Sequence, residues 1–346
     1  MATEHVTGFS SDALGDIARR EGPERRAGQG PWQIAYRRLR RNRVALVFGA
    51  LFLVITALCV AAPLWANSVA DTGPLKNHLT DKVTVDGKQA DVVAPDGVPI
   101  GPTYQREFFL GADGNGRDIA VRLLYGGRNS LLIGVAAALI TALLSVIVGT
   151  LAGYFRGWVD AVISPVLEVI WAYPAILLGV ALGTALSLGG LDVGPIHLDG
   201  DSKLIPVVII AVVYVPYMAR PLRGQVLALR EKEFVEAAEA QGASSLRIMA
   251  SEILPNLSST IIVFLPLMIA NAILLEAALS FVGAGIRPPE PSWGTMISEG
   301  VKTIVTGPHL TIVPGLMLVL TVLALNVFGD GVRDAVDPRA KVRVEH

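Results

Sequence analysis

Long apolar runs recur along the chain and predict membrane-spanning helices. A helix needs about 20 apolar residues to cross the hydrocarbon core of a bilayer. The first run, Val44 to Trp65, is too long and too far from the N-terminus to be a cleaved signal peptide. Five further candidate spans are Ser130 to Leu151, Ile163 to Leu186, Leu204 to Ala219, Ser259 to Val282 and Leu310 to Phe328. Pro206 and Pro216 interrupt the Leu204 to Ala219 run, which makes it the weakest candidate.

The polar segments between the runs predict the remaining organisation. The stretch "PWQIAYRRLRRN" places Trp32, Tyr36 and Leu39 near helical spacing beside arginines, which is typical of an amphipathic helix at the membrane surface. In "DKVTVDGKQADVVAPDGVPI", "DG" turns separate short β-branched runs and predict a small hairpin. The expected division is a cytosolic tail and interfacial helix (1–43), the first span (44–66), an extracytoplasmic loop (67–129), a five-helix core (130–329) with a cytosolic loop (220–258), and a cytosolic tail (330–346).

Composition supports a multi-pass membrane protein. Hydrophobic residues make up 52% of the 346 residues and charged residues only 17%. The 29 basic and 30 acidic side chains leave no basic surplus for nucleic acid. No phosphate-binding loop of the G-x-x-x-x-G-K-[ST] type is present, and the five histidines lack metal-ligand spacing. We therefore expect no cofactor, metal site or catalytic centre in this chain.

Arginine and lysine placement predicts the orientation. The basic run from Arg37 to Arg43 places the N-terminus in the cytosol, and six spans return the C-terminus to the same side. Three arginines before the second span, Arg117, Arg122 and Arg128, oppose this assignment, but the positive-inside rule weakens in a loop of that length. The tight-turn sequence "DGNGRD" lies in the same loop and lacks the glycine that a calcium-binding loop needs at its sixth position.

The stretch from Glu233 to Leu257, "EFVEAAEAQGASSLRIMASEILPNL", is a polar element between two apolar runs. Its pattern predicts a helix from Pro221 to Gln241 that stops at Gly242, because glycine enters the left-handed conformation cheaply. Ser244 or Ser245 can cap a second helix, which Pro255 ends. A helix, sharp turn and helix with small residues and protruding carboxylates fits a groove on a cytosolic partner. A solvated loop without a partner is the alternative.

Polar residues within the apolar runs are candidates for function, because they are costly in hydrocarbon. Glu276 is a candidate pathway or gate residue, and an interhelical hydrogen bond is its alternative role. Glu168 lies nearer a membrane end, and Asn271 and Asn326 are expected to join interhelical hydrogen bonds. A proton-coupled carrier that uses Glu276 and Glu168 is a rival function, although no internal repeat is seen. An intramembrane hydrolase would need a nucleophile and a base at matching depth.

The polar element also carries a family resemblance. "EAAEAQG", followed after nine residues by "EILP", resembles the EAA loop of ABC importer permeases. The resemblance assigns the role of coupling to the ATPases to Glu236, Ala237, Ala238, Gly242, Leu254 and Pro255. Glu252 stands where the family pattern has isoleucine.

Other segments resemble one branch of that family, the C-type permease subunits of oligopeptide, dipeptide or nickel importers. These are "WQIAYRRLRRNRVAL", "LGADGNGRDIAVRLLYGGRNSLLIG", "EAALSFVGAGIRPPEPSWG" and "LNVFGDGVRDAVDP". The resemblance implies an all-α, six-span type I (MetI-like) permease in the cell membrane. It also implies a homologous second permease subunit, two cytosolic ATPases that bind ATP and Mg²⁺, and an extracytoplasmic substrate-binding protein.

Overall fold

The computed structural model describes residues 31–85, 87–194 and 196–337. Within these residues, five helices are long and apolar enough to cross a membrane, and a bent helix pair gives a sixth if it forms one span. The five are α3 (Arg43–Val60), α5 (Ile119–Phe155), α8 (Leu204–Arg230), α11 (Leu254–Phe281), which is continuous with the short helices before it, and α13 (His309–Val336). The six-span prediction therefore depends on the bent pair.

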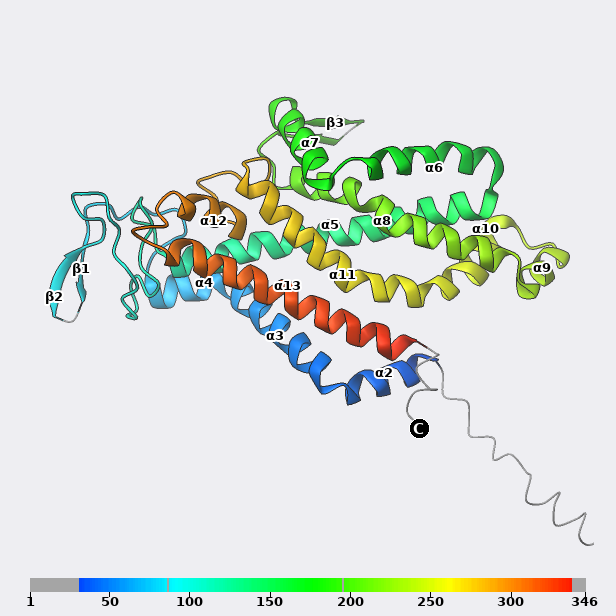
Figure 1. Cartoon of the computed structure of the whole chain (residues 1–346), viewed down its shortest axis with the longest axis horizontal. Helices are drawn as coiled ribbons and strands as arrows, with labels where there is room; N and C mark the ends of the chain where they lie inside the picture. Colours follow the sequence, from blue (N-terminus) through cyan, green and yellow to red (C-terminus); the bar gives the residue numbers. More distant parts are fainter. Residues whose placement is uncertain (1–30, 86, 195, 338–346) are drawn as a thin grey trace, which may run out of the picture.

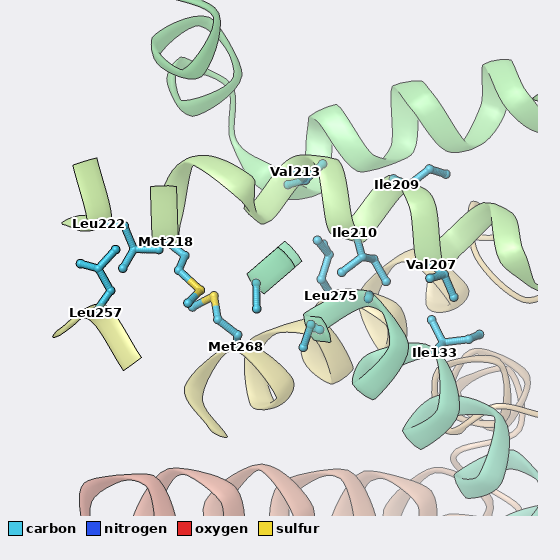
Figure 2. Close-up of a cluster of buried hydrophobic side chains, with 14 of the residues drawn as sticks. Ile133, Val207, Ile209, Ile210, Val213, Met218, Leu222, Leu257, Met268 and Leu275 are labelled. Atoms are coloured by element: carbon cyan, nitrogen blue, oxygen red, sulfur yellow. The ribbon is translucent and has the colours of Figure 1, made fainter. Parts of the chain in front are cut away.

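Helices α5 and α8 lie together at the centre of the main core, with α11 packed against both. Small residues allow the close approach: a Cβ atom on Gly149 would lie 2.8 Å from the carbonyl oxygen of Ala219. Figure 2 shows the apolar side chains that fill the space between these helices, with Met218 of α8 and Met268 of α11 pointing toward one another. Helices α5 and α8 therefore form a closely packed central pair, against which the helices of the bent pair and α11 also pack.

The bent pair corrects the prediction of one continuous span from Ile163 to Leu186. Helix α6 (Gly157–Ala172) and helix α7 (Ala175–Gly189) meet at an angle of 97°. The break falls at Pro174, because a proline pushes the residue before it into an extended conformation. Tyr173 accordingly has φ −88° and ψ 138°. The apolar pattern continued through this break and did not reveal it.

Helix α8 was the weakest predicted span, yet 61% of its apolar window is buried. It continues through Pro216 and Pro221 to Arg230, so both its predicted end at Ala219 and a separate helix from Pro221 to Gln241 are wrong. A buried bundle can satisfy the backbone groups that prolines disturb. The neighbouring helix also bonds to the backbone beside the proline: the Ser145 hydroxyl of α5 donates to the carbonyl oxygen of Val215, the residue before Pro216, at 3.0 Å.

Two other helices exceed their predicted bounds. Helix α5 begins at Ile119 rather than Ser130, and the Asp118 carboxylate caps it by accepting from the Val121 N–H at 3.0 Å. Burial is the main influence on this carboxyl group and raises the pKa of Asp118. Helix α13 extends to Val336, so the start of the predicted C-terminal tail is helical. The predicted N-terminal tail, 1–30, lies outside the described residues.

The predicted amphipathic helix and hairpin are present, together with short elements that were not predicted. Helix α2 (Pro31–Arg41) is the amphipathic segment, and the guanidinium of Arg38 donates to the carbonyl oxygen of Asp337 at 2.7 Å. After α3, the chain continues through α4 (Ala62–Trp65) and the π-helix η1 (Ala66–Ala70). Strands β1 (Lys82–Val85) and β2 (Lys88–Asp91) form the expected antiparallel hairpin, and β3 (Leu191–Val193) pairs with β4 (Ile196–Leu198).

The two ends of the helical bundle carry different structures. Figure 1 shows α9 (Glu233–Ala240) and α10 (Ser245–Ile248) at one end of the long helices, and α12 (Trp293–Val301) with the β1–β2 hairpin at the other. If the bundle spans a bilayer, the polar element and the hairpin therefore lie on opposite sides of it.

Candidate coupling surface and buried carboxyl site

The polar element between α8 and α11 is anchored by apolar side chains. It consists of α9, α10 and the π-helix η2 (Met249–Ile253). Its buried residues join the core cluster that contains Leu222 and Val226 of α8. They are Val235, Ile248 and Ile253, each at most 1% exposed, and Leu257 of α11 joins the same cluster. Close-packed interiors resist sliding. The element and the adjoining end of α8 therefore form one packed unit.

The turn after α9 has the hydrogen bonds of a Schellman motif. The Gly242 N–H donates to the Glu239 carbonyl at 2.9 Å, and the Ala243 N–H donates to the Ala238 carbonyl at 3.0 Å. Gly242 has φ +79°, in the left-handed region. The predicted conformation of Gly242 is confirmed, and it redirects the chain from α9 into α10.

The second helix of the element differs from its prediction at one end. Ser244 is the N-cap, because its hydroxyl accepts from the Arg247 N–H at 3.4 Å, as the sequence allowed. Pro255 does not end the helix: the chain passes through η2 directly into α11, where Pro255 occupies the first turn. The π-helix before it changes the hydrogen-bond register, since the Leu254 N–H donates to the Met249 carbonyl oxygen, five residues back. The polar element is thus continuous with α11, one of the helices long enough to span a membrane.

The outward side of the element combines carboxylates with apolar side chains. Glu236 and Ala237 are exposed, whereas Ala238 is partly buried. Leu246 is 73% exposed and Leu254 40% exposed, although both are apolar. We call these five residues, together with Phe234, the coupling surface. Exposed apolar side chains ringed by charges are typical of a surface that binds another protein.

Glu276 lies in a buried polar cluster near the opposite end of α11. Its side chain is fully buried, and the Ser280 hydroxyl donates to Glu276 Oε1 at 2.7 Å. The same hydroxyl accepts from the Ile286 N–H at 3.0 Å, which ties the carboxyl group to the turn after α11. Among the described residues, Glu276 Oε2 has no hydrogen-bond partner. The contacts fit a structural role for this carboxyl group, and its role in a pathway or gate stays a prediction.

The other polar residues of the spans are less enclosed. Glu168 is exposed, as expected for a residue near a membrane end, and its Oε1 atom lies 4.0 Å from Nη2 of Arg220 on α8. The Tyr214 hydroxyl donates to the backbone carbonyl of Asn271, so the interhelical bond there uses the main chain rather than the amide. Asn326 Oδ1 is buried without a hydrogen-bond partner in the described part of the chain. Within residues 31–85, 87–194 and 196–337, the expected interhelical hydrogen bonds of the Asn271 and Asn326 amides are not seen.

A buried ion network on the hairpin side was missed by the sequence reasoning. Arg117 Nε donates to Asp113 Oδ2 at 2.6 Å, and the guanidinium groups of Arg117 and Arg122 both donate to Glu299 Oε2, at 3.1 and 2.8 Å. Arg122 also donates to the backbone carbonyl of Pro289. The network joins the start of α5 to α12 across more than 170 residues of sequence. The only sign of this network in the sequence is the group of charged residues in "DGNGRDIAVR", which does not identify their partner on α12.

Comparisons with known proteins agree with this architecture. Residues 145–342 match the family described as the binding-protein-dependent transport system inner membrane component, and residues 30–80 match the N-terminal transmembrane domain of oligopeptide transport permease C. A glutathione transport system permease protein, GsiD, of Pectobacterium atrosepticum is 34% identical over 90% of this chain and 92% of its own. A dipeptide transport system permease protein, DppC, of Alkalihalophilus pseudofirmus is 35% identical over 90% and 91%.

A solved structure shows the same fold. It is an inward-facing form of the MetNI methionine ABC transporter, with a TM-score of 0.50 and 19% identity, covering 62% of this chain and 96% of that one. The helical fold is therefore that of a type I (MetI-like) ABC importer permease. The helices, the family match over residues 145–342 and the match to relatives over 90% of the chain lead to one conclusion. This multi-pass protein belongs to the family of binding-protein-dependent transport system inner membrane components.

Proposed function

We propose that this chain is a translocation subunit of an ATP-driven importer of di- or oligopeptides. The observation that carries the proposal is the coupling surface, which is exposed yet rigidly mounted on α8 by buried side chains. The family description supports a partner that binds substrate, and the names of the relatives, glutathione and dipeptide permeases, support a peptide. The partners are a homologous second permease, two cytosolic ATPases that supply ATP and Mg²⁺ chemistry, and an extracytoplasmic binding protein.

The mechanism follows from the packing of the element. Closure of the ATPases around ATP displaces the coupling surface, and the buried contacts of Val235 and Ile248 carry that displacement to α8. Because α8 packs along α5, the opposite ends of the bundle change their arrangement together. Such coupling requires that the ATPases bind the two arrangements with different free energies.

Reversal of one charge tests this proposal. A charge-assisted hydrogen bond that a basic group on the ATPase donates to the Glu236 carboxylate contributes about 1.5 to 3 kcal/mol. Glu236→Lys should therefore abolish uptake, and the purified complex should lose its ATPases or hydrolyse ATP without responding to loaded binding protein. The control is Asp334→Lys, an exposed carboxylate near the end of α13. Normal uptake and normal stimulation in Glu236→Lys would refute the coupling role and favour a carrier.

The substrate class has its own test. Purified binding protein should retain di- or oligopeptides, and loading it with these should stimulate ATP hydrolysis by the complex. Retention of a nickel chelate instead would leave the importer architecture intact and replace the peptide as substrate. Uptake that persists without any ATPase would refute both versions.

A further inference from the structure

Helix α6 is attached to the bundle by few apolar contacts. Of its side chains only Leu167 is buried, in a small cluster with Val215 and Ala219 of α8. The exposed side chains of α6 include Val162 and Val166, which face lipid or a partner rather than the core of this chain. A helix with so little burial needs other contacts to fix its position.

A bidentate ion pair supplies such a contact near the start of α6. Arg223 of α8 donates from Nε to Asp160 Oδ1 and from Nη2 to Asp160 Oδ2, both at 2.6 Å. The Ser164 hydroxyl also donates to Asp160 Oδ1, at 2.6 Å. Both charged side chains are less than one-third exposed, Arg223 at 31% and Asp160 at 22%. Bidentate geometry fixes orientation as well as distance.

Arg223 belongs to the packed unit that carries the coupling surface. Its neighbour Leu222 and the following-turn residue Val226 are fully buried against the coupling element. Two further contacts join the same ends: Arg156, at the α5–α6 junction, donates to Glu231 at 2.5 Å, and the Arg230 guanidinium donates to the carbonyl oxygen of Tyr154. The base of α9 is thus connected to the junction of α5 and α6.

We propose that Asp160 and Arg223 are positioning residues that transmit displacement of the coupling surface to α6 and, through the bend at Pro174, to α7. The proposal rests on the proposed function of that surface. At the far end of this route α7 packs closely against α11 and the turn that follows it. A Cβ atom on Gly179 would lie 2.9 Å from Leu279, and one on Gly183 would lie 2.6 Å from the Ala284 carbonyl. Movement of α7 therefore shifts the turn that also binds the Glu276 cluster.

The test is a charge exchange within the full complex. Asp160→Arg and Arg223→Asp each place like charges at this contact, and we expect each to lower the stimulation of ATP hydrolysis by loaded binding protein about tenfold. Basal hydrolysis should persist, because the coupling surface still binds the ATPases. The double variant, Asp160→Arg with Arg223→Asp, restores opposite charges and should recover most of the stimulation. Intact assembly and basal hydrolysis in the single variants separate loss of transmission from a structural fault, because a structural fault would lower these as well.

A matched control lies on the same pair of helices. Glu168 of α6 and Arg220 of α8 are 4.0 Å apart and more exposed, at 63% and 44%. Reversal of either should leave stimulation within about twofold of wild type, because exposed pairs contribute little. Wild-type stimulation in both single variants of Asp160 and Arg223 would overturn the proposal. Equal loss in the singles and the double, with intact assembly, would overturn it too.

The outcomes separate this inference from the proposed function. If Glu236→Lys abolishes stimulation while the Asp160 and Arg223 variants do not, the coupling surface is correct and the route through α6 is wrong. If Glu236→Lys has no effect, the proposed function itself fails, whatever the result at Asp160.

Discussion

Gly242 offers the sharpest test of the coupling element, because its effect is purely conformational. A Cβ atom at this position would meet nothing within 4 Å, so a substitution causes no steric clash with a neighbour. The cost comes from φ +79°, a left-handed conformation that is unfavourable for residues with a Cβ atom. Gly242→Val should therefore destabilise the Schellman turn by about 1 to 2 kcal/mol.

That free energy predicts a measurable local opening. A change of 1 to 2 kcal/mol corresponds to a factor of roughly 5 to 30 in an equilibrium constant. Hydrogen exchange of the Ala243 amide, which donates to the Ala238 carbonyl at 3.0 Å, should accelerate by that factor in the assembled complex. Because the turn sets the direction of α10, co-purification of the ATPases and uptake should fall as well.

An asparagine variant provides the control. Asparagine tolerates the left-handed conformation better than valine. Gly242→Asn should thus retain most of the amide protection and most of the uptake. Unchanged exchange and uptake in Gly242→Val would show that the turn does not determine the docking geometry, and the reasoning from φ would be refuted.

Three further predictions address the rest of the chain. A cysteine introduced at Lys88 should react with an impermeant reagent added outside, and one at Ser244 should not; reaction at both would contradict the predicted topology. Glu276→Gln should retain uptake, because the Ser280 hydroxyl can donate to an amide oxygen, whereas Glu276→Leu should abolish uptake. Loss of uptake in both variants would show that transport requires a charge at this position. The Asp192 carboxylate raises the pKa of His197, so an NMR titration should show a lower pKa in Asp192→Asn. The Asp192–His197 contact stabilises the β3–β4 hairpin fully at pH values below the ordinary histidine pKa, and this stabilisation is lost as the pH rises through the raised pKa of His197. The same His197 pKa in Asp192→Asn and in the wild type would rule out this contact.

Local signals in the sequence predicted local structure well. The left-handed conformation of Gly242 and the serine cap depend on a few neighbouring residues. The first is confirmed, and the cap, expected at Ser244 or Ser245, is at Ser244. The first and last residues of the helices were harder to predict, because they also depend on contacts with distant parts of the chain. Helix α5 starts before its apolar run: Asp118 caps it, and Arg122 in its first turns pairs with Glu299, far away in sequence. The prediction that Pro255 ends a helix was wrong because this residue lies in the first turn of α11, which follows the π-helix η2 without a break.

The bent pair and the ion pairs were beyond a single-sequence pattern. Periodicity reports how apolar a segment is, not whether it is straight, so the break at Pro174 was hidden inside one apolar run. Likewise, Asp160 and Arg223 stand 63 residues apart, and nothing in their immediate surroundings links them. Candidate coupling residues were found because they share one short motif, whereas the route away from them depends on contacts between helices.

The buried network also bears on the orientation of the chain. Arg117 and Arg122 were two of the three arginines that opposed the predicted topology, since they precede the second span on the side assigned as external. The structure pairs both with Asp113 and Glu299, and their side chains are at most 5% exposed. The positive-inside preference concerns basic residues that face the aqueous phase near a membrane. Paired and buried arginines therefore carry little weight in that count, and Arg128 is left as the single exposed exception among the three.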